Sequence, residues 1–296
     1  MGFFSFFKRK KAPKSVEQVE NSKIKAGIAF GSGGTRGFAH LGVLKAFEDE
    51  GISFDYVAGT SAGSIVGALY SAGYTVSQMV ELLSDLSVKD VKGTNLIFMP
   101  TKSDYIEKVI ERFSGQLQFS DLKKKFACVA VDLISGEEIV LKEGFVAKAV
   151  SASCAVPPFY RPVVYNDMHL IDGAYANPIP ANVARSLGAD VVISVEVNSN
   201  RKGGTDSLHI LDVYRAATRI ATSKTAEEGI KNSDVLIMPN LKEFKAYNID
   251  SVNVMIQKGY DAAYEKMEQI KTLLEIENPT QNCKKCAPTI NFRKIK

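Results

Sequence analysis

The segment Gly59-Thr60-Ser61-Ala62-Gly63 lies between two apolar runs of different character. Residues 54–58 are typical of a short strand, and residues 64–70 are typical of a helix. A serine at the apex of a sharp strand-to-helix turn is the context of a nucleophile elbow. The flanking glycines permit a strained backbone and the close approach of neighbouring elements. The five-residue pattern also occurs in proteins that are not hydrolases, so a base and an oxyanion hole must come from elsewhere in the chain.

A second glycine-rich segment, residues 31–37 (Gly-Ser-Gly-Gly-Thr-Arg-Gly), follows a predicted strand and opens a predicted helix. Backbone amides at such a helix start point toward an anion, which suits either a nucleotide phosphate or an oxyanion. The dinucleotide pattern Gly-x-Gly-x-x-Gly does not fit, because Arg36 stands where the third glycine is needed. An oxyanion hole requires only closely placed amides, which Gly33 and Gly34 can supply. Each such donor typically lowers a barrier by about 3–4 kcal/mol.

The order of predicted elements favours an α/β fold with a mostly parallel sheet covered by helices. Residues 75–115 are helical around an irregular centre, and both ordinary covering helices and a lid remain open for them. One hydrolase domain is expected over residues 23–275, between a leader with its linker (1–22) and a tail (276–296). Strands are predicted at 24–30, 54–58, 126–132, 138–141, 163–165, 168–171, 191–195 and 235–238, and further helices at 41–50, 145–152, 206–231 and 251–274.

A serine hydroxyl needs a base to take its proton, and the chain has only three histidines. His40 follows the glycine-rich loop and is expected to pack or hydrogen-bond. His169 is three residues before Asp172 on a predicted strand, so the two side chains are expected on opposite faces. His209 has the chain order of a triad member but lies at the start of a predicted helix. The scarcity of histidine makes a Ser–Asp dyad an alternative to a triad.

Asp172 ends an apolar run and is followed by Gly173. An Asp-Gly pair most often begins a turn without any catalytic role. The setting also places a carboxylate at the end of a strand, where it can act as a general base. The pair alone does not decide between these interpretations.

Three separated blocks together resemble the patatin-like phospholipases, in the family's order: residues 32–37 (Ser-Gly-Gly-Thr-Arg-Gly), 59–63 (Gly-Thr-Ser-Ala-Gly) and 172–174 (Asp-Gly-Ala). Residues 152–157 and 159–162 resemble a further family block. The likeness covers residues 23 to 238 and is strongest to bacterial members and to the catalytic domain of neuropathy target esterase. Ser32 departs from the pattern, because many members have a glycine there.

The resemblance implies a three-layer α/β/α fold and a Ser–Asp dyad. Carried over, Ser61 is the nucleophile, Asp172 is the general base, and Gly33 and Gly34 form the oxyanion hole. Arg36 occupies the family's basic position in the loop, where it braces the loop or supports the substrate electrostatically. No cofactor and no metal is implied.

The composition excludes several other functions. A formal net charge of +4 on 296 residues does not indicate nucleic-acid binding, and no run is long enough for a transmembrane helix. Cys128 and Cys154 are expected as core thiols. The single pair Cys283 and Cys286 lacks the further ligands of a zinc site, so a solvated tail is expected, with intersubunit zinc or redox roles left open.

The first 14 residues combine four phenylalanines with five basic residues, but not in the order of a signal peptide. This leader suits peripheral contact with an anionic membrane, and a soluble tail is the alternative. We therefore expect a cytoplasmic protein, in contact with the inner face of the membrane if the leader binds. The expected activity is a phospholipase- or lysophospholipase-type esterase acting on a lipid or other fatty acyl ester through an acyl-enzyme. The alternative is a membrane-associated regulatory or binding protein with a vestigial hydrolase site.

Overall fold

The structure is a computed structural model that describes residues 24–89, 107, 111–112, 115–198, 205–244 and 251–276. The leader, the tail with Cys283 and Cys286, and the irregular centre of residues 75–115 lie outside these ranges. The predictions made for them are therefore untested.

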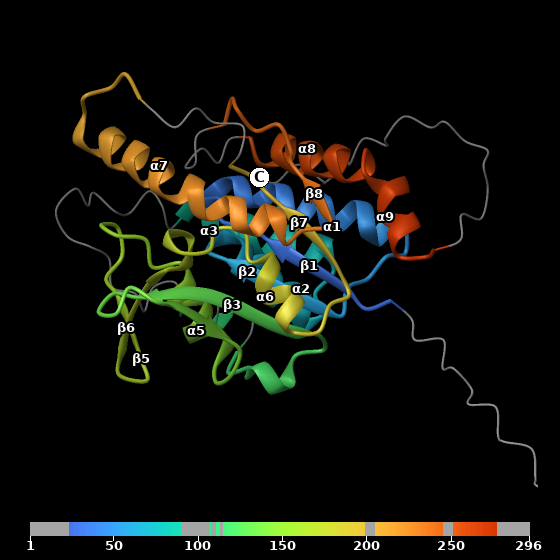
Figure 1. Cartoon of the computed structure of the whole chain (residues 1–296), viewed down its shortest axis with the longest axis horizontal. Helices are drawn as coiled ribbons and strands as arrows, with labels where there is room; N and C mark the ends of the chain where they lie inside the picture. Colours follow the sequence, from blue (N-terminus) through green and yellow to red (C-terminus); the bar gives the residue numbers. More distant parts are fainter. Residues whose placement is uncertain are drawn as a thin grey trace, which may run out of the picture.

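An eight-stranded mixed sheet forms the middle of the protein (Figure 1). Its order is β5-β6-β3-β2-β1-β7-β8, and β4 pairs with the side of β3 that is opposite to β2 and β6. Five neighbouring strands, β3, β2, β1, β7 and β8, run parallel to one another. The strands β4, β5 and β6 form antiparallel pairs at one side of the sheet. The strands are β1 (Ala26–Phe30), β2 (Tyr56–Thr60), β3 (Lys125–Asp132), β4 (Glu138–Leu141), β5 (Val163–Tyr165), β6 (Met168–Asp172), β7 (Val191–Val195) and β8 (Val235–Ile237).

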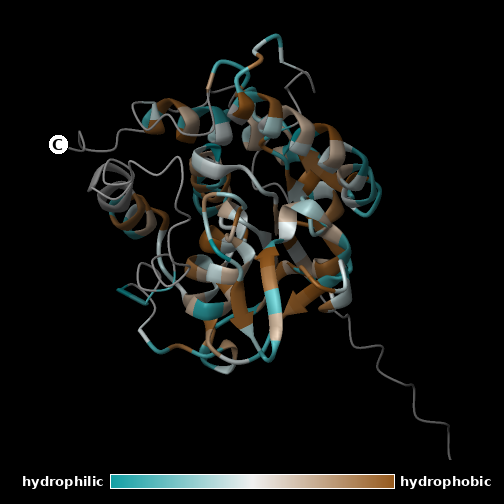
Figure 2. Cartoon of the chain, turned by 90° about the vertical axis from the view of Figure 1, so that its left-hand side faces the viewer, coloured by the Kyte–Doolittle hydropathy of each residue, from teal (hydrophilic) through white to brown (hydrophobic). Residues whose placement is uncertain are grey.

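Helices cover both faces of this sheet, which confirms the predicted three-layer α/β/α fold. The larger apolar cluster joins one face of the sheet to α1, α2, α3, α5, α8 and α9, and a smaller cluster joins the other face to α6. Figure 2 shows apolar strands enclosed by the helices. The helices are α1 (Phe38–Asp49), α2 (Ala62–Ala72), α3 (Val76–Lys89), α5 (Val146–Ser153), α6 (Ala181–Ser186), α7 (Ile210–Lys231), α8 (Val252–Tyr264) and α9 (Met267–Leu273), with 3-10 turns η1 (Gly34–Gly37), η2 (Phe119–Asp121) and η3 (Gly173–Tyr175).

Several predicted element boundaries were wrong, three of them with a clear physical reason. The strand expected at 54–58 is two residues further along, because each residue of β2 pairs with one of β3 from Lys125 to Val129, and this pairing overrides local preference. The helix expected over 206–231 begins only at Ile210. The single helix expected over 251–274 is two helices, because the amide of Lys266 bonds three residues back, to Ala263, and so tightens the last turn of α8.

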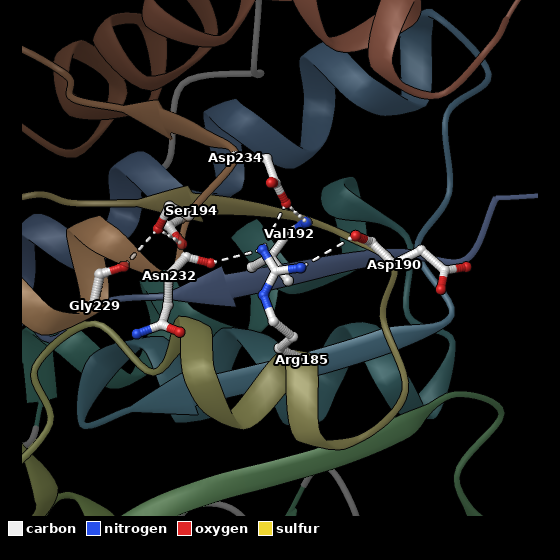
Figure 3. A network of polar contacts seen from close by, with 8 residues as sticks. Arg185, Asp190, Val192, Ser194, Gly229, Asn232 and Asp234 are labelled. Atoms are coloured by element: carbon white, nitrogen blue, oxygen red, sulfur yellow. Dashed lines mark hydrogen bonds and ion pairs between the residues drawn. The ribbon is translucent and has the colours of Figure 1, made fainter.

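A polar network joins the amino-terminal ends of β1, β7 and β8 (Figure 3). The Arg185 guanidinium donates to the backbone oxygens of Asp190 (3.2 Å) and Asn232 (3.0 Å) and to the carboxylate of Asp234 (2.8 Å). The amide of Lys25, just before β1, donates to the Asp190 carboxylate at 3.0 Å. These bonds fix the amino-terminal ends of the strands. The Ser61 turn lies at the opposite edge of the sheet, where β2 ends.

Gly63 places the elbow against the end of β1. A Cβ atom on this residue would lie 2.1 Å from the Phe30 carbonyl oxygen and 2.7 Å from that of Gly31. Both atoms belong to the backbone, which cannot move aside as a flexible side chain could. The position therefore requires glycine, and it brings the elbow and the glycine-rich loop into direct contact.

We predict that Gly63→Ala destabilises the protein by several kcal/mol and lowers the thermal midpoint by about 10 °C, because it forces two backbones apart. Gly67→Ala in the same helix is the matched control, since the atoms nearest to its new Cβ belong to the side chains of Phe126 and Val57 rather than to the backbone. Thermal unfolding followed by circular dichroism measures both. Equal midpoints for the two variants would contradict the close-approach argument.

Candidate active site

Ser61 lies in a strained turn between β2 and α2. Its φ of +54° and ψ of −124° are uncommon for a residue with a side chain. Its amide donates to the Ser153 hydroxyl at 3.0 Å, and its carbonyl accepts from the amide (2.8 Å) and the hydroxyl (2.6 Å) of Ser64. Bonds from α5 and α2 thus hold the turn in its unusual conformation.

The strand register brings Asp172 to this turn. Thr60 pairs with Val129 of β3, and Asp172 of β6 pairs with the next residue, Ala130. The strand β4 pairs with Cys128–Val131 on the opposite side of β3, so β2 and β6 lie on the same side of that strand. Ser61, which follows β2, and Asp172, which ends β6, therefore meet on that side at the level of Ala130. The Thr60 hydroxyl also donates to the backbone oxygen of Asn177 at 2.8 Å, which ties the elbow strand to the segment after Asp172.

The Asp172 carboxyl is completely buried. Burial raises its pKa to about 7, and the hydroxyl of Ser61 and the amide of Ala174 act in the opposite direction. Its Oδ1 accepts from the Ala174 amide at 2.8 Å. Among the described residues, Oδ2 has no well-formed hydrogen bond, so its contact with Ser61 is loose. A carboxyl group beside a serine, with a pKa near neutrality and one oxygen available, has the properties of a general base.

The three histidines lie in different environments. His40 is buried, its Nε2 donates to the Gly31 carbonyl at 2.8 Å, and burial lowers its pKa to about 4. This confirms the expected packing and hydrogen-bonding role. His169 is exposed on β6, and His209 is exposed at the start of α7. Neither exposed ring has a hydrogen bond to Ser61 or Asp172.

The glycine-rich loop uses its first two amides and leaves the next two open. The amide of Gly31 donates to Val195 O and that of Ser32 to Pro178 O, both at 2.9 Å. The amides of Gly33 and Gly34 make no hydrogen bond to any described residue. Together with the contact between Gly63 and β1, this arrangement offers two free N–H donors beside the elbow.

The side chains of Arg36 and Asn198 hold the loop from behind. One guanidinium nitrogen of Arg36 donates to the Val197 carbonyl at 3.4 Å, and the side-chain amide of Asn198 donates to Ser32 O. Arg36 is buried beneath the loop. The contact that the structure shows for Arg36 is therefore the bracing contact expected as one of its two roles.

Two sets of site residues were not predicted. Ser153 lies in a segment whose likeness to the family was noted, but no role was assigned to its hydroxyl. Tyr175, three residues after Asp172, hydrogen-bonds the Tyr214 hydroxyl at 2.6 Å, and Tyr214 donates to Pro157 O at 2.5 Å. No local pattern marks Tyr214, because it meets the site only through the folding of α7.

The described residues other than Ser61 and Asp172 include two free thiols and line a cavity. Within the described ranges, no three His, Cys, Asp or Glu side chains are grouped to hold a metal ion. Cys128 and Cys154 are buried free thiols, as predicted. A cavity of about 450 Å³ lies near Phe119, Lys125 and Lys142, toward the amino end of β3 and away from Ser61. Of the helices that the structure describes, none is long and apolar enough to cross a membrane.

Comparisons with known proteins identify the family of the chain. The family model described as patatin-like phospholipase matches residues 28–185. A Caenorhabditis elegans patatin-like phospholipase domain-containing protein is 28% identical over 279 residues, 82% of this chain and 26% of that protein. An NTE family protein of Mycobacterium tuberculosis is 26% identical over 199 residues, 65% of this chain and 54% of that protein. The chain therefore spans only about a quarter to a half of these relatives.

The fold also has a solved counterpart. The crystal structure of VipD from Legionella pneumophila superimposes with a TM-score of 0.57 at 13% identity, over 83% of this chain and 67% of that one. Because the family model covers more than half of the sequence, the chain belongs to the patatin-like phospholipase family, a class of lipid hydrolases. The resemblance expected from the three blocks, including that to the neuropathy target esterase group, is confirmed.

We predict that kcat/KM for a water-soluble p-nitrophenyl ester rises about tenfold per pH unit below pH 7 and levels off above it. The reason is that the base must be ionised, and the pKa of Asp172 is about 7. His40, with a pKa of about 4, stays neutral across this range. Asp132→Asn, at a hydrogen-bonded carboxylate next to the same sheet edge, is the control and should leave the midpoint unchanged. A rate independent of pH between 5 and 8 would exclude Asp172 as the titrating base.

We predict that Ser153→Ala lowers kcat by about tenfold to a hundredfold with little change in KM, because the Ser61 amide loses its acceptor and the turn relaxes. Ser153→Thr retains the hydroxyl and should restore part of the rate. The paired measurements are steady-state kinetics and thermal unfolding. If the alanine variant showed wild-type kcat, the Ser153 hydroxyl would have no positioning role.

Proposed function

We propose that the chain is a serine-dependent lipid acyl hydrolase of the phospholipase or lysophospholipase type, in which Ser61 is the nucleophile and Asp172 is the general base. The observation that supports this most directly is the buried Asp172 carboxyl next to the strained Ser61 turn, with its pKa raised to about 7. Family membership supports the class of reaction, and the site geometry supports the roles of the residues.

In the first half of the reaction, the Ser61 hydroxyl attacks the carbonyl carbon of a fatty acyl ester while Asp172 takes the hydroxyl proton. The carbonyl oxygen becomes a tetrahedral oxyanion, which the amides of Gly33 and Gly34 stabilise. Asp172 then returns the proton to the leaving alcohol as the ester C–O bond breaks. The product of this half is an acyl-enzyme on Ser61.

In the second half, water replaces the alcohol. Asp172 takes a proton from the water as its oxygen attacks the acyl carbonyl, and the same two amides stabilise the second oxyanion. Collapse of this intermediate releases the fatty acid and returns the proton to Ser61. A single carboxyl group can serve both halves because its pKa, near 7, lets it gain and lose a proton at neutral pH.

The proposed partners are a lipid or another fatty acyl ester as substrate and an anionic membrane surface contacted by residues 1–14. A cytoplasmic location on the inner face of the membrane fits this proposal. The leader lies outside the described residues, and its role rests on its four phenylalanines and five basic residues.

We predict that Ser61→Ala and Asp172→Asn each lower hydrolysis of a p-nitrophenyl fatty ester by at least about a thousandfold, because each removes one half of the dyad. His209→Ala is the control and should keep a near wild-type rate, since this exposed ring lies outside the dyad. A loss of several orders of magnitude at His209 would instead indicate a triad.

Labelling with a fluorophosphonate completes this test. The wild-type chain should be labelled at Ser61, and Ser61→Ala should not be. Folded wild-type protein that neither reacts with the probe nor hydrolyses the ester would overturn the proposal in favour of a vestigial site.

A further inference from the structure

Helix α7 carries an exposed apolar stripe. Ile210, Val213 and Ile220 are 73%, 40% and 55% exposed, and Ala217 between them is exposed as well. Their spacings of three, four and three residues place them on one face of the helix. Leu208, just before the helix, is 93% exposed. Apolar side chains in a row on one helix face indicate a contact surface more strongly than single exposed residues do.

The stripe lies beside the candidate active site. On α7, Tyr214 follows Val213 directly and hydrogen-bonds Tyr175, which is three residues after Asp172. Tyr214 also donates to Pro157 O, so one end of α7 is attached to two segments around the site. The start of α7 lies at the left of Figure 1, the side toward which β3 runs. Any surface that covers the stripe would therefore lie next to the Ser61 edge of the sheet.

A second apolar element projects from the same edge. Leu133 and Ile134 follow the last residue of β3 and are 52% and 79% exposed. Because Ala130 of β3 pairs with Asp172 of β6, this loop begins three residues beyond the level of Asp172. The stripe on α7 and this loop are thus two exposed apolar elements next to the site.

The charge of the stripe-bearing part of α7 suits an anionic partner. The whole helix has four cationic residues (Arg215, Arg219, Lys224 and Lys231) and three carboxylates (Asp212, Glu227 and Glu228). In its first part, residues 210–224, which bears the stripe, three of the cationic residues stand against one carboxylate, Asp212, which accepts a hydrogen bond from the Ser207 hydroxyl at 2.7 Å. Apolar side chains combined with an excess of cationic residues on one helix are typical of helices that bind the surface of an anionic bilayer. Two copies of the chain packed through this face would bring two cationic segments together, which disfavours self-association.

We propose that the stripe (Leu208, Ile210, Val213, Ala217 and Ile220), together with Leu133 and Ile134, docks the protein on an anionic phospholipid surface and presents the Ser61 edge to it. This docking surface adds to the proposed function. It rests on that function only in that lipid hydrolysis is the reason for the protein to bind a lipid surface. The docking itself is independent of catalysis, and it is separate from contact through the leader.

The test is sedimentation with vesicles of phosphatidylcholine, with and without phosphatidylglycerol, in the full chain carrying Ser61→Ala so that no lipid is consumed. The double variant Val213→Ser/Ile220→Ser should bind the anionic vesicles about tenfold or more weakly, because two inserted side chains are lost. The matched control is Val254→Ser/Ile276→Ser, two residues of similar exposure (50% and 38%) that lie at α8 and after α9. The control should bind like the parent, and Lys224→Glu should weaken binding only to anionic vesicles.

In the chain with Ser61 intact, the stripe variant should keep its rate on a water-soluble short-chain ester and lose rate on vesicle phospholipid. Equal vesicle binding by the stripe variant, the control and the parent would overturn the docking proposal. A parent dimer in light scattering that the stripe variant alone dissociates would overturn it too, because a second copy would then cover the face. If the stripe double variant unfolds, Ile220→Ser alone provides the same comparison. Absence of hydrolysis would refute the proposed function and leave the binding result standing.

Discussion

The backbone of Ser61 is held in a conformation that a residue with a side chain rarely adopts, and the site depends on keeping it there. A turn of this kind typically costs about 1–3 kcal/mol, so surrounding bonds must determine it. Ser153 on α5 accepts the Ser61 amide, and Ser64 on α2 donates twice to the Ser61 carbonyl. Gly63 then presses the start of α2 against the end of β1, where any larger residue would meet backbone atoms. The Ser61 turn is positioned by the packing of three layers rather than by its own local sequence.

The second constraint is the burial of Asp172. A carboxylate withdrawn from water is destabilised, and the raised pKa is the direct expression of that effect. Between the ordinary pKa of an aspartate and about 7, the folded protein therefore loses stability as the pH rises, because the unfolded chain releases this proton more readily. The same destabilisation makes the ionised group a stronger base toward the adjacent hydroxyl. His40 is buried and bonded to Gly31, and the other two histidine rings are exposed.

Much of the fold could be predicted from the sequence, because buried parallel strands are continuous apolar runs and the turns between them contain glycine. The elbow, the glycine-rich loop and the end of β6 could also be located, because each is an apolar run followed by a turn that contains glycine. The role of Ser153 and the Tyr175–Tyr214 pair could not be predicted, since these contacts depend on how α5 and α7 pack. The break between α8 and α9 was missed because both halves continue one apolar pattern, and only the hydrogen bond of Lys266 to Ala263 marks the end of the first.

The two edges of the sheet differ in a way that fits a protein that acts at a surface. At the amino-terminal ends of β1, β7 and β8, Arg185 and its partners satisfy backbone carbonyls and carboxylates, and the edge is closed by polar bonds (Figure 3). At the opposite edge, two loop amides are unpaired within the described residues, and apolar side chains of α7 and the β3–β4 loop face outward. An edge with open donors and exposed apolar groups is unfavourable in water alone. In the proposed function, an ester carbonyl would occupy the amides, and in the proposed docking an apolar lipid phase would cover the side chains.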